Sequence, residues 1–478
     1  MNRKQVAITL GIMCFMLTIA ISVQLKTMNS ANSTVSQSLT ENSLRDEVLK
    51  WKEKYDNIYM QLGQAENRLE EVRNVATQDS TSSTAKQEEL KNNNIILGLT
   101  DVTGPGIEIV LKDNNNISSE LLSTQILDMN KLVVHNSDLI AIVNILKHAN
   151  AEAISINGQR IISTSAITCE GSVIKINGEK ITSPFTIKAI GPTDLFYGSL
   201  IMPGGYIYYM EEDGIIVEKK KMDNISIEKY NGVINSKYIK AKRWYIWKLD
   251  KDQIIMSIII GLVCIVLICI VSIQFKTIEE TDITAIENMK EDELRTTLSE
   301  WKTKYEETYE KYEETITTID EYNKKIESSE EASELLDKEL EKSNLIAGNT
   351  DVYGEGIIVT LIDNDEQTIK AEDLLELVNE LRYAGAEAIS INDVRIINTT
   401  DIVEVGNSLV MVGGQRLSSP YVVKAIGNQA YLSSILSLKN SGFIDKYNNS
   451  GKTVTLVANK KVEILKNNGK TDIKYINK

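Results

Sequence analysis

Three polar residue types recur together twice along the chain, and they are the best candidates for chemistry. In each copy a glutamate is followed five residues later by an asparagine and, three residues further on, by an arginine; the positions are Glu152, Asn157, Arg160, Glu387, Asn392 and Arg395. A carboxylate can bind a guanidinium in a forked ion pair, and asparagine suits the turn of a hairpin. We therefore interpret the cluster as a structural ion pair, with contact to a peptide or small ligand as the alternative.

Residues for catalysis or metal binding are scarce. The chain has two histidines, His135 and His148, which align with a lysine and a tyrosine in the second copy, so no imidazole is repeated for acid–base catalysis. Cys169 has no cysteine counterpart, and the other three cysteines lie in apolar runs. No nucleophile and base recur together. The sequence predicts no catalytic, cofactor or metal site, and we expect the protein not to be an enzyme.

The composition is that of an acidic chain with enough apolar residues for packed cores. Of its 478 residues 42% are hydrophobic, the formal net charge is -15 and the pI is near 4.9. A nucleic-acid-binding surface would be basic, so no nucleic-acid partner is expected. Four cysteines do not make a disulfide scaffold.

The chain is an internal duplication. Leu44, Trp51, Tyr55 and Asp101 return 250 residues later, and beyond Asp113 the offset falls to 235 because the first copy carries about 15 extra residues in a polar stretch. This period is far too long for a solenoid repeat. It indicates two tandem copies of a whole protein.

Each copy begins with an uncharged apolar run, at residues 6–25 and 254–275. Both have the roughly 20 residues that a helix needs to cross a bilayer, so we expect two transmembrane helices. A cytoplasmic tail at residues 1–5 precedes the first, and a basic, aromatic juxtamembrane linker at residues 236–253 precedes the second. A cleaved signal peptide is the alternative for the first run.

Each apolar run is followed by a stalk, at residues 40–91 and 285–343, in which apolar residues alternate at spacings of four and three. This pattern predicts a coiled coil. The best seam positions are Leu44, Val48, Trp51, Tyr55, Ile58, Leu62, Leu294, Leu298, Trp301 and Tyr305. Because an isolated amphipathic helix gains little stability, we expect the stalks to pair with each other or with another chain. The acidic second stalk fits either a solvated helix face or a docking surface for a basic partner.

The stalks lead into domain 1, residues 92–235, and domain 2, residues 344–472. Gly104-Pro105-Gly106 is interpreted as a turn into a strand, since a phosphate-binding glycine loop needs a strand before it and a helix after it. A helix with Asp138 or Asp373 at its N-cap, two hairpins with Asn-Gly or Gly-Gly turns, a short helix and a final strand follow. We expect an α+β sandwich with helices on one side of a mostly antiparallel sheet.

The motif Ala-Glu-Ala-Ile-Ser-Ile-Asn at residues 151–157, followed by Arg160, and the later Ser-Pro and Lys-Ala-Ile-Gly at residues 183–191 resemble the bacterial family DUF881. These are YlxW-like, UPF0749-type membrane proteins of Gram-positive bacteria. The resemblance covers nearly the whole chain twice, and it implies a membrane-tethered protein with no established activity, encoded in some genomes near division genes. Family members generally carry one copy, so this chain looks like two neighbours joined.

The leading hypothesis is a non-enzymatic, membrane-anchored structural or interaction protein, a cell-envelope or division scaffold that acts through coiled-coil pairing and its domains. The alternative is a membrane-tethered sensor or binding module for a peptide or small ligand. Expected partners are membrane lipid, a homo- or hetero-oligomer formed through the coiled coils, and unknown envelope or division proteins.

The orientation in the membrane is ambiguous. Basic residues before both apolar runs favour the same orientation, whereas two consecutive spans must cross in opposite directions. We expect domain 1 outside and domain 2 inside. The reverse arrangement, cleavage between the two halves and a gene model that fuses two proteins stay open.

Overall fold

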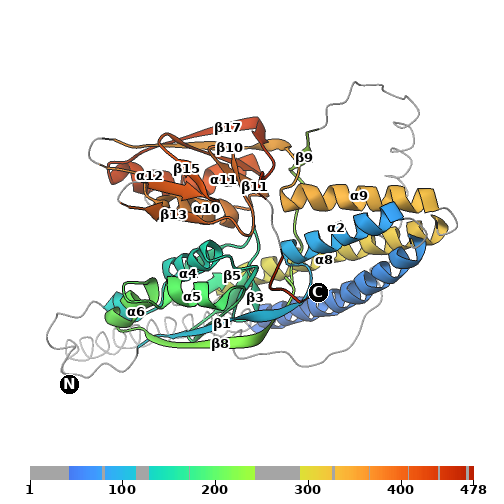
Figure 1. Ribbon diagram of the computed structural model, residues 1–478, viewed down its shortest axis with the longest axis horizontal. Coiled ribbons are helices and arrows are strands. Elements are labelled where there is room, and N and C mark those ends of the chain that lie inside the picture. Colours follow the sequence, from blue (N-terminus) through green and yellow to red (C-terminus); the bar gives the residue numbers. More distant parts are fainter. Residues whose placement is uncertain are drawn as a thin grey trace, which may run out of the picture. The chain divides into compact units, whose positions relative to one another are not determined.

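The computed structural model describes residues 42–77, 81–114, 129–171, 173–242, 291–325, 329–364, 367–406, 409–439, 442–469 and 473–477 (Figure 1). The predicted tail and both predicted transmembrane segments, residues 6–25 and 254–275, lie outside this set. Of the helices that are described, none has the length and hydrophobicity needed to cross a bilayer. The described residues form two compact units, one from residues 42–69 with 291–318 and the other from the described residues of 70–242 and 319–477.

The larger unit contains both domains, each built on an antiparallel sheet. In domain 1 the strand order is β3 (Gln159–Arg160), β2 (Ala153–Ile156), β7 (Phe185–Ile190), β1 (Val102–Lys112) and β8 (Ile216–Ile227). Domain 2 repeats it with β12 (Val394–Ile396), β11 (Ala388–Ile391), β16 (Tyr421–Ile426), β10 (Val352–Ile362) and β17 (Thr453–Ile464). The predicted α+β class with antiparallel pairing is therefore confirmed.

Each domain adds a small sheet and several helices. The small sheets are β4 (Ile167–Glu170), β5 (Val173–Ile176) and β6 (Glu179–Ile181), and β13 (Ile402–Val405), β14 (Leu409–Val412) and β15 (Gln415–Leu417). The helices are η1 (Met129–Leu132), α4 (Asn136–His148), α5 (Thr193–Leu200) and α6 (Tyr206–Asp213), and α10 (Ala371–Tyr383), α11 (Gln429–Leu436) and α12 (Phe443–Asn449). Two short helices thus precede each final strand, where the sequence predicted one.

The core of each domain lies between one face of the main sheet and the helices. In domain 1, Ile107, Ile109 and Leu111 of β1 are fully buried against α4, α5 and α6. Their alternation is that of a strand with one covered face. Ala189 of β7 joins this core, whereas its neighbour Ile190 belongs to a smaller apolar cluster, because successive side chains point to opposite faces.

The predicted start of the main helix is wrong by three residues. The N-caps are His135 and Lys370, and Asp138 and Asp373 lie inside the first turn. Each aspartate accepts a hydrogen bond of 2.8 Å from the backbone N–H of the N-cap residue, which is the reciprocal half of a capping box. An acidic side chain in the first turn stabilises a helix from that position as well as from the N-cap.

The glycine motif is not a turn. Strand β1 begins at Val102, and Gly104 and Gly106 lie at a bulge inside it, where the pairing with β8 shifts register. A side chain on Gly106 would overlap the carbonyl oxygen of Ala189 in the adjacent strand. The glycine therefore permits a close approach of two backbones.

The predicted hairpin turns are confirmed. Asn157 and Gly158 have φ of 46° and 82°, and the equivalent Asn392 and Asp393 have φ of 44° and 64°. Two consecutive positive φ angles define the turn that matches the twist of a two-residue hairpin. The second hairpin, at Asn177, turns in the same way.

The smaller unit is a parallel helix pair. It consists of the first part of the helix at residues 42–76 and the first part of α8 (Glu291–Lys325). Equivalent seam positions meet: Leu44, Val48, Leu294 and Leu298 form one buried cluster. The ring centroids of Trp51 and Tyr305 are 5.4 Å apart, and those of Tyr55 and Trp301 are 5.3 Å apart. The two stalks thus pair with each other, one of the two arrangements expected.

In the larger unit the stalk helices turn back. The hydroxyl of Tyr322, near the end of α8, lies 3.5 Å from the carboxylate of Glu339 in α9 (Ser329–Ala347), and Arg73 lies 2.8 Å from the same carboxylate. In one straight helix, residues 17 positions apart would be separated by about 25 Å. The chain therefore reverses direction between α8 and α9, and α2 (Thr81–Leu97) lies beside α9 (Figure 1).

Candidate functional site

The two repeated glutamates bind backbone amides instead of arginine. The carboxylate of Glu152 accepts hydrogen bonds of 2.6 to 3.0 Å from the N–H groups of Lys474, Tyr475 and Ile476. In the same way Glu387 accepts hydrogen bonds of 2.7 to 2.9 Å from three consecutive N–H groups, those of residues 237–239. Hydrogen bonds to a charged acceptor are about twice as strong as neutral ones, so each carboxylate fixes a short bend of the chain.

The bound stretches come from the other half of the chain. The segment that follows domain 1 adds strand β9 (Lys240–Ala241) to the edge of β10 in domain 2. The segment that follows domain 2 bridges Thr103 of domain 1 through Asn477. We call residues 237–241 and 473–477 the exchanged segments. The start of the predicted juxtamembrane linker is therefore part of the sheet of domain 2.

The predicted ion pairs are wrong, because each arginine is buried elsewhere. Arg160 and Arg395 are 1% and 3% exposed. Burial lowers the pKa of each guanidinium to about 10, although Asp101 opposes the shift at Arg160. Nη1 of Arg160 donates to the carbonyl oxygen of Glu228 at 3.4 Å. Nε and Nη2 of Arg160 and Nη1 of Arg395 have no hydrogen-bond partner among the described residues.

The repeated asparagines serve the hairpin turn, as interpreted from the sequence. Oδ1 of Asn157 accepts a hydrogen bond of 2.6 Å from the N–H of Thr186, and its Nδ2 donates to the carbonyl oxygen of Pro184 at 3.1 Å. Asn392 makes the equivalent bonds to Val422 and Pro420. The asparagine therefore ties the turn to the adjacent strand in both domains, and it does not contact the glutamate or the arginine of the predicted cluster.

A second pair of asparagines joins the two domains directly. Asn144 of α4 donates to the carbonyl oxygen of Ile402 at 2.7 Å and accepts from its N–H at 2.9 Å. Asn379 of α10 makes the same two bonds, of 3.0 and 2.9 Å, to Ile167. Both asparagines are buried. Each one thus completes the first strand of the small sheet in the opposite domain.

This reciprocity corrects the expected membrane orientation. Domains that share buried hydrogen bonds cannot lie on opposite sides of a hydrocarbon layer about 30 Å thick. The arrangement with domain 1 outside and domain 2 inside is therefore excluded for a folded, intact chain.

Two equivalent basic residues meet beside the asparagines. Lys147 and Arg382 line one small cavity together with Asn144 and Asn379. Burial and the like charge of Arg382 hold the pKa of Lys147 well below its usual value, and Asp401 offsets part of this effect. Burial also lowers the pKa of Arg382 to about 10. The charged form of Lys147 therefore destabilises the domain interface.

Replacing Lys147 by methionine is expected to stabilise the protein by about 1–3 kcal/mol at neutral pH, because an apolar side chain of similar length removes a desolvated charge. A lysine with a lowered folded-state pKa makes stability rise with pH, from that folded pKa up to the unfolded value of about 10.4. This rise should be missing from Lys147→Met in thermal unfolding measured across pH.

Lys220→Met is the matched control, since Lys220 is exposed. It should change the free energy of unfolding by no more than about 0.5 kcal/mol. If Lys147→Met destabilised the protein, or kept the alkaline rise, the interface would not contain an unfavourable charge.

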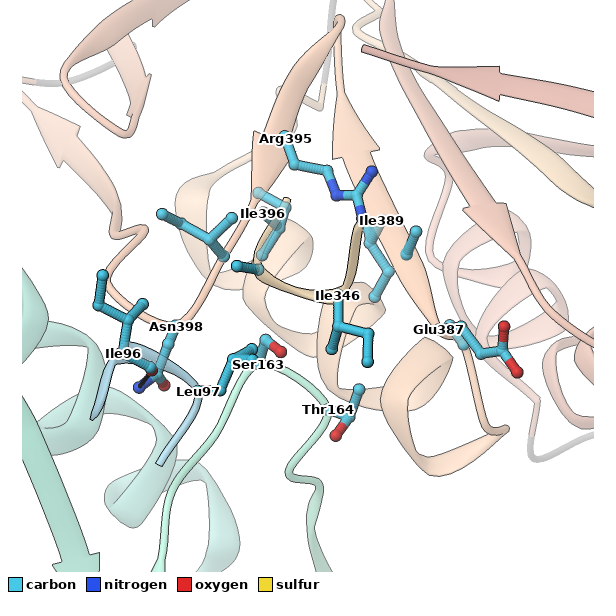
Figure 2. A pocket seen from close by; sticks show the side chains of 14 residues that line it. Ile96, Leu97, Ser163, Thr164, Ile346, Glu387, Ile389, Arg395, Ile396 and Asn398 are labelled. Carbon is cyan, nitrogen blue, oxygen red and sulfur yellow. Dashed lines mark hydrogen bonds between the residues drawn. The ribbon is translucent and has the colours of Figure 1, made fainter. Parts of the chain in front are cut away.

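Two further cavities lie where the domains meet. The smaller, of about 20 Å³, is lined by Ile96, Leu97, Ser163 and Thr164 on one side and by residues of domain 2 on the other. Figure 2 shows Glu387 and Arg395 at separate places on its wall. This volume is enough for a single water molecule.

The larger cavity, of about 590 Å³, opens between domain 1, domain 2 and the exchanged segment 473–477. Its polar lining includes Glu152, His148 and Asp401, and Nδ1 of His148 lies 2.6 Å from Oδ2 of Asp401. A volume of this size is in the range of small-molecule sites. Within the described residues no three histidine, cysteine, aspartate or glutamate side chains gather as metal ligands.

Sequence reasoning missed both reciprocal contacts. The exchanged segments share the tripeptide Lys-Tyr-Ile, at residues 237–239 and 474–476, which was a usable signal. The asparagines Asn144 and Asn379 align between the copies, but nothing in the sequence shows that their partners lie in the opposite copy.

Comparison with known proteins agrees with the repeated architecture. The family model described as "Bacterial protein of unknown function (DUF881)" matches residues 89–240 and 339–477, more than half of the chain. The UPF0749 protein YlxW of Bacillus subtilis (strain 168) is 27% identical over 203 residues, which cover 42% of this chain and 85% of that protein. The UPF0749 protein YlxX of the same organism is 31% identical over 155 residues, covering 29% of this chain and 66% of that protein.

A solved structure also matches part of the chain. The crystal structure of an uncharacterized conserved protein from Mycobacterium tuberculosis is 19% identical and covers 34% of this chain and 99% of that chain, with a TM-score of 0.25. The two family matches and the two sheets with the same strand order lead to one conclusion. The chain belongs to the DUF881 family of bacterial proteins of unknown function, and it carries two copies of the family domain in tandem.

Proposed function

We propose that this chain is a non-enzymatic, membrane-anchored structural protein in which two DUF881 domains form a built-in dimer that serves as an interaction platform at the cell envelope or division site. The observation that carries the proposal is the reciprocal joining of the domains, through Asn144 and Asn379 and through the two exchanged segments. Because the repeated polar residues join the two domains to each other, the domains keep one relative arrangement and present a fixed surface to partners.

The helix pair supports the same function. Equivalent seam residues meet in parallel, so the two copies begin at the same end of the pair. The apolar runs at residues 6–25 and 254–275 have the composition of membrane anchors. Neither copy pairs a nucleophile with a base in its sequence, which favours binding over catalysis.

Membrane fractionation of the full-length chain tests the proposal. The intact protein should sediment with membranes and require detergent for extraction, and deletion of residues 6–25 together with 254–275 should release it. An intact chain that stays soluble without detergent, or that turns over a substrate through groups of either domain, would contradict the proposed function.

The cavity of about 590 Å³ favours a second candidate, a sensor for a small ligand or peptide. A ligand that binds only the folded form raises the melting temperature, so thermal-shift screening of the detergent-extracted chain against cell-wall fragments and nucleotides distinguishes the two. A saturable rise in melting temperature that disappears in His148→Ala would favour the sensor; unchanged melting across the screen would favour the platform.

A further inference from the structure

We propose that each domain carries a binding slot for a bent Lys-Tyr-Ile segment, and that the occupant is the segment that follows another DUF881 domain. In this chain the other half supplies it, and a second copy of the chain has the same segments to offer. The inference names the contact by which such domains recognise each other; it does not depend on the membrane anchoring or scaffold role proposed above.

The first component of the slot is a carboxylate that accepts hydrogen bonds from backbone N–H groups. Glu152 and Glu387 lie at the same position, immediately before the first strand of the central hairpin, and each binds three consecutive N–H groups. Successive N–H groups of an extended strand point to opposite sides, so three consecutive N–H groups reach one carboxylate only where the chain bends, and Tyr238 and Tyr475 both lie at bends. The carboxylate also excludes proline at the central position, because proline has no N–H.

The second component is an open strand edge. Asn477 donates its N–H to the carbonyl oxygen of Thr103 at 2.8 Å, and Lys242 donates to Asp351 at 2.9 Å. The exchanged segment thus runs antiparallel to the start of β1 or β10. Addition of a strand to a sheet edge is a general mode of peptide recognition, in which main-chain hydrogen bonds supply affinity.

Glycine keeps this edge accessible. A side chain on Gly104 would overlap the carbonyl oxygen of Tyr475, and one on Gly354 would overlap that of Tyr238. The first glycine of the bulge is therefore required by the bound segment, whereas the second is required by the neighbouring strand. This explains why both copies retain two glycines in one strand.

The third component is an apolar pocket that selects the isoleucine. Ile476 is 7% exposed and packs with Val102, Ile190, Ile225 and other residues on the face of the sheet opposite the main core. Ile239 is 5% exposed in the equivalent cluster of domain 2. Because burial of an isoleucine side chain is favourable and depends on its shape, the side chain adds specificity to the backbone contacts.

The two occupants differ in their surroundings but share these features. One segment lies in the middle of the chain and the other at residues 473–477, yet both present Lys-Tyr-Ile to the glutamate of the opposite domain. The duplication supplies the tripeptide twice, and the equivalent contact forms from two different places in the chain. The slot therefore binds the segment in both connectivities.

Hydrogen exchange on the intact, full-length chain tests the slot without removing any part of it. Glu152→Gln keeps the size of the side chain but removes its charge and offers a donor to the three N–H groups. Amide protection at residues 474–476 should fall by about 10- to 100-fold, the loss expected for hydrogen bonds to a charged acceptor. Protection at residues 237–239 should stay unchanged.

Glu387→Gln is the matched control, with the reverse pattern expected. Loss of protection at residues 237–239 alone would support the slot in domain 2. If either substitution left its own segment protected, or exposed both segments equally, the glutamates would not be the binding groups and the proposal would be overturned.

Peptide binding gives a second test. A chain that ends after Gly469 lacks the segment that occupies the slot of domain 1. A labelled peptide of residues 471–478 should bind to this slot saturably. Binding should weaken by about tenfold or more with Glu152→Gln and with a peptide methylated on the Tyr475 nitrogen, and should be unaffected by Glu387→Gln.

The outcome is distinguishable from that of the membrane test. A truncated chain that keeps the melting transition of domain 2 but binds no peptide, or that binds the methylated peptide equally well, would overturn the slot and leave the proposed function standing. A soluble chain that binds the peptide would support the slot and contradict the membrane role.

Discussion

Replacing Asn144 or Asn379 by leucine is expected to lower the free energy of unfolding by roughly 2–4 kcal/mol and to open the contact between the two domains. Leucine has nearly the same size but can neither donate nor accept, so the N–H and the carbonyl group of Ile402 would lose this buried partner in Asn144→Leu. In Asn379→Leu the N–H of Ile167 loses its partner, whereas its carbonyl oxygen keeps a hydrogen bond of 3.4 Å from Nδ2 of Asn136, so we expect the smaller effect there. An unsatisfied buried polar group costs about 1–3 kcal/mol.

Denaturant unfolding combined with hydrogen exchange measures this effect. In Asn144→Leu the amide of Ile402 should lose protection, and in Asn379→Leu the amide of Ile167 should do so. The double variant should unfold less cooperatively, since each domain has a hydrophobic core of its own.

Asn448→Leu provides a control within one domain. Asn448 makes the same pair of bonds, of 3.1 and 2.9 Å, to the carbonyl oxygen and the N–H of Val454 in its own domain. Because Asn448 is exposed, water can replace these bonds, so this variant should cost less stability than the two interface variants and leave Ile167 and Ile402 protected. Equal exchange at these two amides in all three variants would show that the asparagines do not hold the domains together.

The sequence predicted those features that depend on residues close together in the chain. The hairpin turn at Asn157 is visible because a positive φ selects asparagine and glycine, and the seam at Leu44 and Val48 is visible because its spacing repeats. The alternation in β1 identified a strand with one buried face. Local propensity and periodicity were sufficient for the fold class.

The site could not be predicted in the same way, because its contacts join residues far apart. Glu152 and Arg160 are close in sequence and opposite in charge, which favoured an ion pair, but the carboxylate binds a segment more than 320 residues away. Gly104 was interpreted as a turn residue, since turns are the commonest reason for glycine pairs. Its actual role depends on a backbone from the other copy.

The duplication explains why the ion pair at Glu152 and the turn at Gly104 were both predicted wrongly. Comparing the copies shows which residues repeat, but an alignment of equivalent positions cannot distinguish a contact within a copy from a reciprocal contact between copies. Asn144, Glu152 and Gly104 all make reciprocal contacts between the copies. A residue pair that repeats in a tandem protein should therefore be tested against the opposite copy before a local partner is assigned.

Cysteine labelling of intact cells should place both domains in the same compartment. Cys169 is exposed in domain 1 and serves as one site. Lys439→Cys, combined with Cys169→Ser, introduces an exposed site in domain 2. Both chains would also carry alanine at Cys14, Cys264 and Cys269, so that a membrane-impermeant maleimide reports one position at a time.

The expected result follows from the buried contacts between the domains, which require that they share one side of any membrane. Both sites should label, or neither should, and both should label after detergent lysis. An immunoblot at 53.5 kDa would show that the labelled chain is intact. Labelling of one site alone in the intact chain would mean that the domains do not bind each other in the cell, and both the built-in dimer and the exchange of segments within one chain would have to be abandoned.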